Sequence, residues 1–443
     1  MSRPAVPKAN SPAAHGAAGS PVRTLQSKPT WDIAILGAGI VGAATALALA
    51  EAGHSVTLFD RDAAGAGTSS GNAGGIVEGA VMPTATPDVI RSLPGYLLDR
   101  DGAAVLRPAY LFQALPWLMR FVAAGRPARM AQIAAALQPL VANAMRAHRK
   151  LTQLSQSENR IAPSGWLKVF ASEAEFIKTR LQREMMLRHG VNFTELSAHE
   201  VHDLEPKLNP KAYTRGLFQP GSGFVNYPRG LVEAYFQGAL QRQARFVQEN
   251  VLEVLAAHAG GVGVKTQTAT HRFDKVVVAA GAWSRQFADQ VGDKVCLDTE
   301  RGYHISLKSM GPPLLTRPVG FPARDCVLSP MHDGITVCSG DELAGLRAAP
   351  DYRRIRSLLP FVHSVLPQTS AQTVQREWMG YRPSTPDSLP VIGPSAQSPN
   401  VIYAFGHGHL GLTLSAVTAE LVTAIVDGDT APFDLTPYRI NRF

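Results

Sequence analysis

Residues 32–42 read DIAILGAGIVG, an apolar run followed by three glycines in the order G-x-G-x-x-G. The run 33–36 is typical of a buried parallel strand, and the small residues at 43–52 predict a helix. A second apolar run at 56–59 predicts another strand, which ends at Asp60. Strand, glycine loop, helix, strand and acid in this order are typical of the βαβ half-unit that binds a dinucleotide.

The residues of this loop have separate physical roles. Gly37 permits the tight turn out of the strand, and Gly39 lets a pyrophosphate approach the backbone. Gly42 lets the helix pack close to the sheet. The N-terminus of the following helix offers free N–H groups and the positive end of its dipole to the phosphates. Ile40 and Val41, within the glycine loop, are also expected to contact the cofactor.

Asp60 lies 23 positions after Gly37. This is close to the spacing of about 20 for the carboxylate that binds a ribose hydroxyl. The acid argues against a 2′-phosphate, so the motif leaves both NAD and FAD open. A tight turn in a domain that binds nothing is the structural alternative.

The composition indicates a globular protein with more than one domain. The chain has 443 residues, 45% of them hydrophobic and 18% charged, which is too long for one typical core. No apolar run approaches the roughly 18 residues that would cross a bilayer. Three dispersed cysteines, Cys296, Cys326 and Cys338, predict neither a disulfide framework nor a metal site. We expect no nucleic-acid partner.

Residues 1–30 have a different composition from the rest of the chain. They are rich in Pro, Ala and Ser, contain four basic residues and no acid, and show no apolar periodicity. This is typical of a disordered tail. The tail lacks the apolar core of a signal peptide, so we expect a cytoplasmic protein.

The loop 61–75 is rich in glycine and serine and directly follows Asp60. Small residues let a backbone approach a flat ring, and hydroxyl or amide side chains can donate hydrogen bonds. We therefore expect a second wrap around the cofactor, although a flexible connection is the alternative. The residues expected to contact the cofactor are Arg61, Ser69, Ser70, Asn72, Ala73 and Gly74.

The segment 102–157 contains seven basic residues and no acid. Tyr110, Trp117 and Phe121 are interleaved with the arginines, and apolar residues recur at helical spacing over 130–145. One interpretation is a surface that binds the headgroups of an anionic membrane, on the inner face of the cytoplasmic membrane. The other is a buried helical pair with a solvated basic rim.

Further patterns predict the rest of the chain. Residues 173–189 are typical of a surface helix, and 246–255 and 273–284 of strands. Ser197 and Glu200 form a capping-box pattern at the start of a helix. Residues 295–338 alternate as in an antiparallel sheet, which predicts a second domain.

The chain resembles the D-amino-acid oxidase-like superfamily of FAD oxidoreductases. Within it, the chain is most similar to the bacterial D-amino-acid dehydrogenases and their hydroxyproline-oxidising relatives. The resemblance extends from residue 31 to about 430. It rests on GAGIVG at 37–42, SSGNAGG at 69–75, TERGYH at 299–304, GYRPSTPDSLPVIG at 380–393 and GHGHLGLT at 406–413.

The resemblance implies FAD as the cofactor. Some relatives attach the flavin to a cysteine in the C-terminal third, but no cysteine follows Cys338 here, so we expect non-covalent FAD. The resemblance also implies that Val251 contacts the adenine, that Ala280 and Gly281 at a strand end face the cofactor, and that residues 406–413 cradle the flavin. The cradle residues are Gly408, Leu410, Gly411, Leu412 and Thr413. It further implies that Arg382 pairs with the substrate carboxylate, with Tyr303 and His407 as further catalytic candidates. A metal pair of His407 and His409 is disfavoured because no carboxylate or thiol cluster accompanies it.

The expected fold is α/β, with a Rossmann-type FAD-binding domain and a second α+β substrate domain on an antiparallel sheet. The expected FAD-binding domain comprises 31–105, 222–295 and 380–443, and the substrate domain 106–221 and 296–379. The expected reaction is oxidation of a D-amino acid, or of D-proline or a hydroxyproline-type imino acid, by hydride transfer from Cα to the flavin. A quinone or another acceptor would then take the electrons. The alternatives are an oxygen-using oxidase, a non-catalytic flavin subunit and an NAD dehydrogenase.

Overall fold

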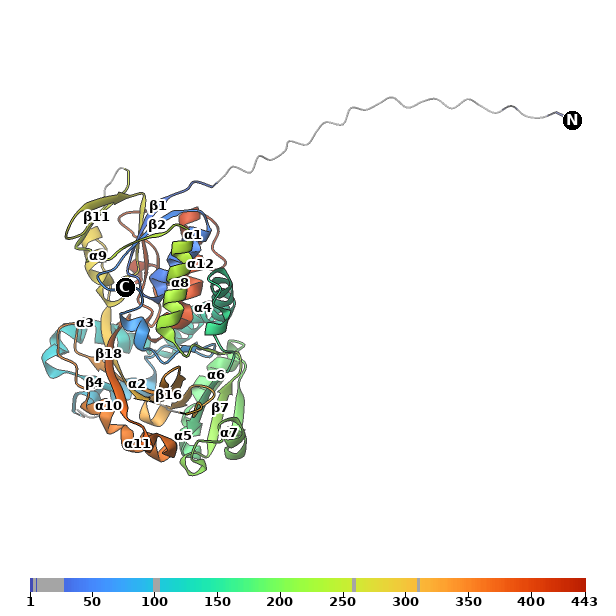
Figure 1. The fold of residues 1–443 in the computed structure, drawn as a ribbon, viewed down its shortest axis with the longest axis vertical. Coiled ribbons are helices and arrows are strands. Elements are labelled where there is room, and N and C mark those ends of the chain that lie inside the picture. The colour runs from blue at the N-terminus through green and yellow to red at the C-terminus, as the bar shows by residue number, and fades with distance from the viewer. Residues whose placement is uncertain (3–4, 6–27, 99–103, 257–259, 309–310) are drawn as a thin grey trace.

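The computed structural model describes residues 1–2, 5, 28–98, 104–256, 260–308 and 311–443. The predicted disorder of residues 1–30 falls mostly outside this range. Figure 1 shows two halves: one contains β1, β2, α1, α8 and α12, and the other contains β16, α2, α3, α10 and α11. Strand β18 runs between them. The expected α/β fold with two sheet-based halves is confirmed.

The first half is built on a six-stranded sheet whose strands are parallel except β19. The predicted strand–helix–strand unit is present, although the helix begins at Ile40, three residues earlier than the sequence pattern indicated. In order across the sheet, the strands are β19 (Val391–Pro394), β20 (Val401–Phe405), β13 (Lys275–Val278), β1 (Asp32–Leu36), β2 (Ser55–Phe59) and β9 (Arg245–Val247).

Alternate side chains of β1 enter two different cores. Ile33 and Ile35 pack against a layer of helices, whereas Ala34 and Leu36 pack against a small three-stranded sheet and α9 (Ser284–Val291). Since both faces are covered, a continuous apolar strand is favourable here. The helices are α1 (Ile40–Glu51), α4 (Pro127–Leu154), α8 (Pro228–Gln241) and α12 (Gly411–Asp427); the small sheet is β10 (Glu253–Ala256), β11 (Val262–Lys265) and β12 (Thr270–Phe273).

The second half contains a nine-stranded, mostly antiparallel sheet. Its longest strands, β14 and β18, pair over most of their length and bring the motif at 299–304 beside the motif at 380–393. The strands are β18 (Val374–Ser384), β14 (Asp298–Lys308), β17 (Gly334–Leu343), β16 (Cys326–Met331), β15 (Val319–Phe321), β5 (Trp166–Phe170), β7 (Arg215–Gln219) and β6 (Thr194–Ser197), with β4 (Ala104–Leu106) beside β17.

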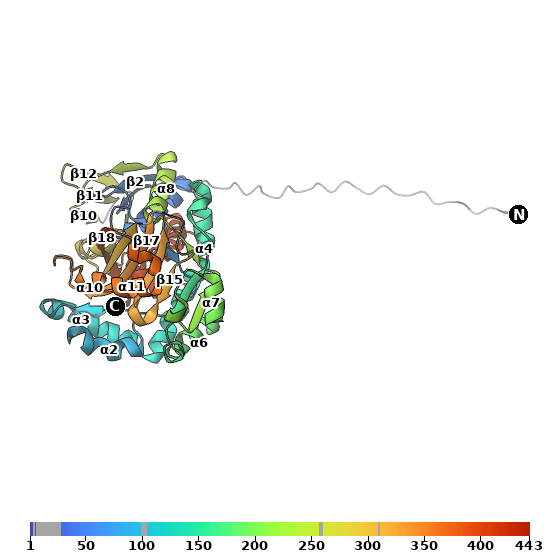
Figure 2. The ribbon, with the colours of Figure 1, turned by 60° about the horizontal axis from the view of Figure 1, so that its bottom comes forward.

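Helices close the ends of this half. α10 (Arg353–Ser357) and α11 (Leu359–Val365) contribute Ile355 and Val362 to the core beneath the large sheet. α7 (Ala198–Leu204) has the predicted capping box at Ser197. Figures 1 and 2 both show α2 (Pro87–Leu98) and α3 (Leu111–Ala124) at the same end of the molecule.

Three expected elements differ from the structure. The strand expected at 273–284 is confined to β13, residues Lys275–Val278, and Ser284 already belongs to α9. Residues 173–189 form two helices, α5 (Glu173–Lys178) and α6 (Arg180–Arg188), with the break at Thr179. The single strand predicted at 246–255 is wrong, because β9 joins the six-stranded sheet whereas β10 joins the three-stranded one.

The structure also departs from the expected domain boundaries. Ile133 and Leu137 of α4 share one core with α1 and α12, although residue 106 was expected to begin the substrate domain. β4 ends at Leu106 and pairs with the large sheet. The chain therefore passes from the large sheet at β4 through α3 to α4, which packs in the core of the first half.

One stretch among the described residues, Gly408–Asp427, has the length and apolarity to cross a bilayer, but 61% of its apolar part is buried inside the fold. It contains α12, whose residues Leu414 and Leu421 are fully buried against α1 and α4. This burial is what a core helix requires.

Candidate active site

A cleft with a volume of about 380 Å³ lies between the two sheets. Its walls come from the loops after β1, β2 and β13, from β14, β17 and β18, and from the start of α12. Eighteen of the expected site residues line it: Gly37, Gly39, Ile40, Val41, Asp60, Arg61, Ser69, Asn72, Ala73, Val251, Ala280, Gly281, Tyr303, Arg382, His407, Gly408, Gly411 and Leu412.

The other five expected residues make contacts within the protein. Gly42 lies so close to Gly37 that a Cβ there would be 1.8 Å from its carbonyl oxygen. Gly74 has φ +77°, and a Cβ there would lie 2.3 Å from the carbonyl oxygen of Val225. The Ser70 hydroxyl donates to Gly67 O at 2.9 Å, the Leu410 N–H donates to His407 O at 2.8 Å, and the Thr413 hydroxyl donates to Gly75 O at 3.2 Å.

The glycine loop is held open for an anionic group. Gly37 has φ +108°, and a Cβ there would lie 2.5 Å from Ala279 O. At Gly39 a Cβ would meet only Ser69 Oγ, at 3.3 Å, so the space above its backbone is clear. Since Gly39 is the N-cap of α1, the N-cap residue itself has no side chain that could cover the N-terminus of that helix. This arrangement fits a pyrophosphate.

Asp60 and Ser69 fix the shape of the loop. The Ala38 N–H donates to Asp60 Oδ2 at 2.7 Å, and the Ile40 N–H donates to Ser69 Oγ at 3.0 Å. The other oxygen of Asp60 accepts from the Asp62 N–H at 3.0 Å. The carboxylate lines the cleft while these bonds hold it in place.

In another part of the cleft lining, α12 begins at Gly411 after a 3₁₀ turn, Gly408–Leu410. Gly408 and Gly411 line the cleft without side chains. The positive end of this 17-residue helix would stabilise the negative charge that a flavin bound there carries when it is reduced. The glycine loop and this helix start both fit FAD.

Arg382 lies in a cluster of charged groups. Its Nη1 donates to Gly340 O at 2.9 Å and also pairs with Asp341. His409 Nε2 lies 3.1 Å from the same Asp341 oxygen. Glu300 accepts from the Ser384 hydroxyl at 2.5 Å and lies 3.9 Å from His409 Nδ1.

The charges of this cluster control one another. Burial would lower the pKa of His409, but the Asp341 carboxylate raises it above its ordinary value. Burial would likewise raise the pKa of Asp341, yet His409 and Arg382 hold it well below its usual range. Burial and the neighbouring Asp341 raise the pKa of Glu300. The cluster therefore presents two cations that share one strongly ionised carboxylate.

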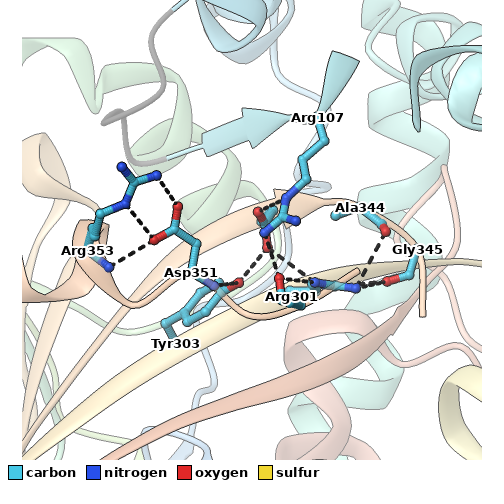
Figure 3. Close-up of polar contacts among 9 residues, drawn as sticks. Arg107, Arg301, Tyr303, Ala344, Gly345, Asp351 and Arg353 are labelled. Atoms are coloured by element: carbon cyan, nitrogen blue, oxygen red, sulfur yellow. Dashed lines mark hydrogen bonds and ion pairs between the residues drawn. The ribbon is translucent and has the colours of Figure 1, made fainter. Parts of the chain in front are cut away.

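Tyr303 belongs to a second network, together with Arg107, Arg301 and Asp351 (Figure 3). Its hydroxyl donates to Glu342 Oε2 at 2.5 Å and accepts from the Asp351 N–H at 3.3 Å. Burial, followed by the bond to Glu342, raises the pKa of Tyr303 to about 12. Because a hydroxyl has one proton, Tyr303 can donate to a substrate only by releasing Glu342.

Glu342 is the centre of that network. Arg107 Nε donates to Glu342 Oε1 at 2.6 Å, and Arg301 Nη1 lies 3.6 Å from Glu342 Oε2, the oxygen that Tyr303 contacts. Arg301 is fully buried and donates from Nε to Gly345 O at 2.8 Å. Arg301 thereby ties β14 to Ala344 and Gly345, which directly follow β17 (Figure 3).

His407 lines the cleft, but its imidazole is buried and its Nε2 lies 2.9 Å from Thr418 Oγ1 of α12. Burial lowers the pKa of His407 to about 3, so the ring is neutral. His407 and His409 have different partners. In the described part of the chain, no three His, Cys, Asp or Glu side chains gather as metal ligands would.

Sequence reasoning did not find several residues of the cleft. Asp341 lies within β17, which has an ordinary strand sequence, and only its pairing with Arg382 across the sheet reveals it. Trp283 lies under the Arg61 guanidinium, 4.2 Å from the ring centroid. Trp378 fills the space beside Gly71, where a Cβ would lie 2.3 Å from its ring. For these tryptophans, aromatic residues next to glycines in the motifs were the available signal.

The aromatic residues of the acid-free segment do not face solvent as the membrane interpretation required. Trp117 and Phe121 are buried and stack on each other at 5.0 Å, and the Tyr110 hydroxyl donates to Asp298 at 2.9 Å. The apolar face of α4 is buried too. The assignment of these aromatics to a headgroup boundary is therefore wrong; they serve the core.

Comparison with known proteins identifies the family. Residues 32–425 match the family model described as FAD dependent oxidoreductase. A D-amino-acid oxidase of Bradyrhizobium diazoefficiens is 35% identical over 422 residues, covering 93% of this chain and 98% of the relative. D-amino acid dehydrogenase 2 of Ralstonia nicotianae is 30% identical over 430 residues, covering 93% and 100%.

The fold is shared with solved structures. Glycine oxidase from Geobacillus kaustophilus superposes with a TM-score of 0.72 at 22% identity, covering 94% of this chain and 99% of that one. The expected resemblance and the FAD cofactor are thereby confirmed. The chain therefore belongs to this family of FAD-dependent oxidoreductases, as an amino-acid oxidoreductase with FAD as its cofactor.

Proposed function

We propose that the protein is a dehydrogenase of D-amino acids, D-proline or hydroxyproline-type imino acids included, whose carboxylate is bound by Arg382. The observation that carries this proposal is the placement of Arg382 in the cleft that the start of α12 also lines. A guanidinium fork can bind both oxygens of a carboxylate and so orient the bond to Cα. The names of the D-amino acid dehydrogenase and oxidase relatives support the same substrate class.

Each part of the cleft has a role in this reaction. Bound FAD supplies the two-electron acceptor for the substrate Cα–H. Arg382 orients the carboxylate, while Asp341 and His409 fix the guanidinium through their shared contact. Trp378 and the glycines of the cleft exclude water and leave room for a flat ring.

The test is the absorption spectrum of the purified protein under anaerobic conditions. Addition of a D-amino acid should bleach the oxidised flavin, whereas the L-enantiomer should not. A protein that contains FAD but is not bleached by any D-amino acid or proline would be a non-catalytic flavin subunit. A non-catalytic subunit would not need a carboxylate clamp, so the presence of Arg382 in the cleft argues against that alternative.

An oxidase is the second candidate, favoured by the 35% identical D-amino-acid oxidase. The reduced protein distinguishes the two. Rapid reoxidation on mixing with air would identify an oxidase; slow reoxidation by air with rapid reoxidation by a soluble ubiquinone analogue would support the dehydrogenase.

We further propose that the protein acts at the inner face of the cytoplasmic membrane, where a quinone takes the electrons. The support is α3, at the edge of the molecule (Figure 1). Phe112 and Met119 are 86% and 66% exposed, with Leu115 and Val122 exposed on the same face. Arg120 and Arg126 are exposed beside them. Apolar side chains with a basic rim suit an anionic bilayer.

Co-sedimentation with vesicles tests this surface. Binding should require anionic lipid, weaken at high salt and be lost in Phe112→Ser/Met119→Ser. Leu187→Ser removes a similarly exposed side chain from α6 and should have no effect. Equal binding of both variants, or none to any vesicle, would refute the membrane proposal.

A further inference from the structure

A second cavity of about 870 Å³ lies beside the cleft, under α2 and α3. The two cavities meet at Asp325, Asp341 and His409, which line both. Known sites for drug-sized ligands have about 300–1,000 Å³, so the space is large enough for a bulky organic group. The reaction at the cleft does not account for a chamber of this size.

We infer that this chamber receives the side chain of the substrate and selects amino acids with large apolar side chains. The inference rests on the proposed function and specifies its substrate class. Asp341 and His409, at the junction, contact Arg382 or share its partner. A group attached to the Cα of a substrate whose carboxylate is bound by Arg382 therefore lies at the entrance of the chamber.

Helix α3 supplies the apolar wall. Trp117, Leu118 and Phe121 face the chamber, whereas Leu115 and Met119 point to solvent. The Trp117 indole donates to Ser384 O at 3.0 Å, two residues along β18 from Arg382. The aromatic wall is thus bonded directly to the strand that carries the carboxylate clamp.

The remaining walls are also mainly apolar. Leu93 lies on α2, Val105 and Leu106 on β4, and Leu343 at the end of β17. Burial of such surface stabilises apolar groups in proportion to their area, so each additional methylene or ring of the substrate gains affinity.

Charged groups of the described lining lie at or beside the junction. They are Glu300, Asp325, Asp341 and His409. The Asp325 side chain is exposed at the cavity surface, and the protein packed around its carboxyl group raises its pKa. The ionised Asp341 already pairs with Arg382 and His409, so an anionic side chain finds no free cation among the described residues of the chamber lining and meets the charge of Asp341. The distal walls offer no acid among the described residues, so a long cationic side chain gains no partner there. Neutral, bulky side chains fit both parts.

The test compares substrates and two variants of one helix in the full-length FAD-loaded protein. Leu118→Trp fills the chamber, and Leu115→Trp places the same residue on the outer face of α3. We expect kcat/KM of the unmodified protein to be higher for D-phenylalanine and D-leucine than for D-alanine, and lowest for D-aspartate. Leu118→Trp should lower kcat/KM for D-phenylalanine by roughly 10- to 100-fold and leave D-alanine within about twofold. Leu115→Trp should change neither.

Direct binding gives a second measurement. Calorimetric titration with 3-phenylpropanoate and with acetate should show that Leu118→Trp weakens only the former. Leu93→Trp fills the chamber from α2 and should act likewise if Leu118→Trp does not fold. Equal losses for D-phenylalanine and D-alanine, no loss for either, or a preference for D-lysine or D-aspartate would overturn the inference. If no D-amino acid is oxidised, the proposed function fails, while the titrations still decide whether the chamber binds a phenyl group.

Discussion

Replacement of Arg382 tests the carboxylate clamp directly. In the structure its Nη1 is bound to Gly340 O and Asp341, and its Nη2 lies over Gly302, where a Cβ would be 2.3 Å away. Arg382→Ala removes the cation but leaves Asp341, which is ionised and then balanced mainly by His409. The substrate carboxylate would lose its partner and also meet an unneutralised acid.

The magnitude follows from these contacts. Truncation of one partner of a buried, hydrogen-bonded charge pair costs about 2–5 kcal/mol. With about 1.4 kcal/mol per factor of ten, kcat/KM should fall roughly 30- to 4,000-fold. We expect the upper part of this range for Arg382→Ala because Asp341 adds repulsion. Arg382→Lys keeps the charge without the fork and should lose less. The double variant Arg382→Ala/Asp341→Asn should recover part of the loss.

The assay is steady-state oxidation of a D-amino acid with a dye acceptor, together with the flavin absorbance of each purified variant. FAD content should remain unchanged because Arg382 contributes to the substrate end of the cleft. Arg376→Ala is the matched control, since Arg376 is exposed on the same strand. A kcat/KM for Arg382→Ala within threefold of the unmodified protein would refute the clamp, and so would an equal loss in Arg376→Ala.

Three further predictions concern FAD and pH. Asp60→Ala removes the acceptor of the Ala38 N–H and should raise the dissociation constant of FAD at least about tenfold without changing substrate preference; fluorescence titration measures it, and an altered preference at saturating FAD would contradict it. FAD should be released completely by acid precipitation, because burial raises the pKa of the Cys338 thiol in the cleft to about 12 and keeps it unreactive; yellow colour retained in the pellet would contradict this. Burial lowers the pKa of His148 to about 4, so the unfolded chain takes up a proton first and stability falls as the pH drops below about 6.5. Between pH 7.5 and 5, the free energy of unfolding measured with urea should fall by about 2 kcal/mol less for His148→Gln than for the unmodified protein. Equal losses would exclude this role of His148.

The dinucleotide loop was predictable because its determinants are local. The strand, the glycines and the acid at Asp60 all act within about thirty residues, and each glycine answers a steric demand that the structure reproduces. The antiparallel second sheet was also predictable from alternation. Arg382 could be named only through the family motif, since a lone arginine on a proline-rich stretch has no distinguishing pattern.

The remainder depended on contacts between distant segments. Asp341 and His409 come from β17 and from the turn before α12, 68 positions apart in the sequence, and no periodicity connects them. Trp117 and Phe121 had the composition of a membrane-binding segment, but tertiary packing places them inside. The break at Thr179 and the separation of β9 from β10 are likewise decided by which core each residue enters.

The hydrogen bonds from Ala38 to Asp60 and from Ile40 to Ser69 have a thermodynamic consequence for cofactor exchange. They fix the loop by contacts within the chain, so the conformational entropy lost on ordering it counts against folding and not against binding. FAD then enters a loop that already has its final shape. Substitutions that loosen the loop should therefore weaken FAD binding more than they destabilise the empty protein, because binding would then have to order the loop.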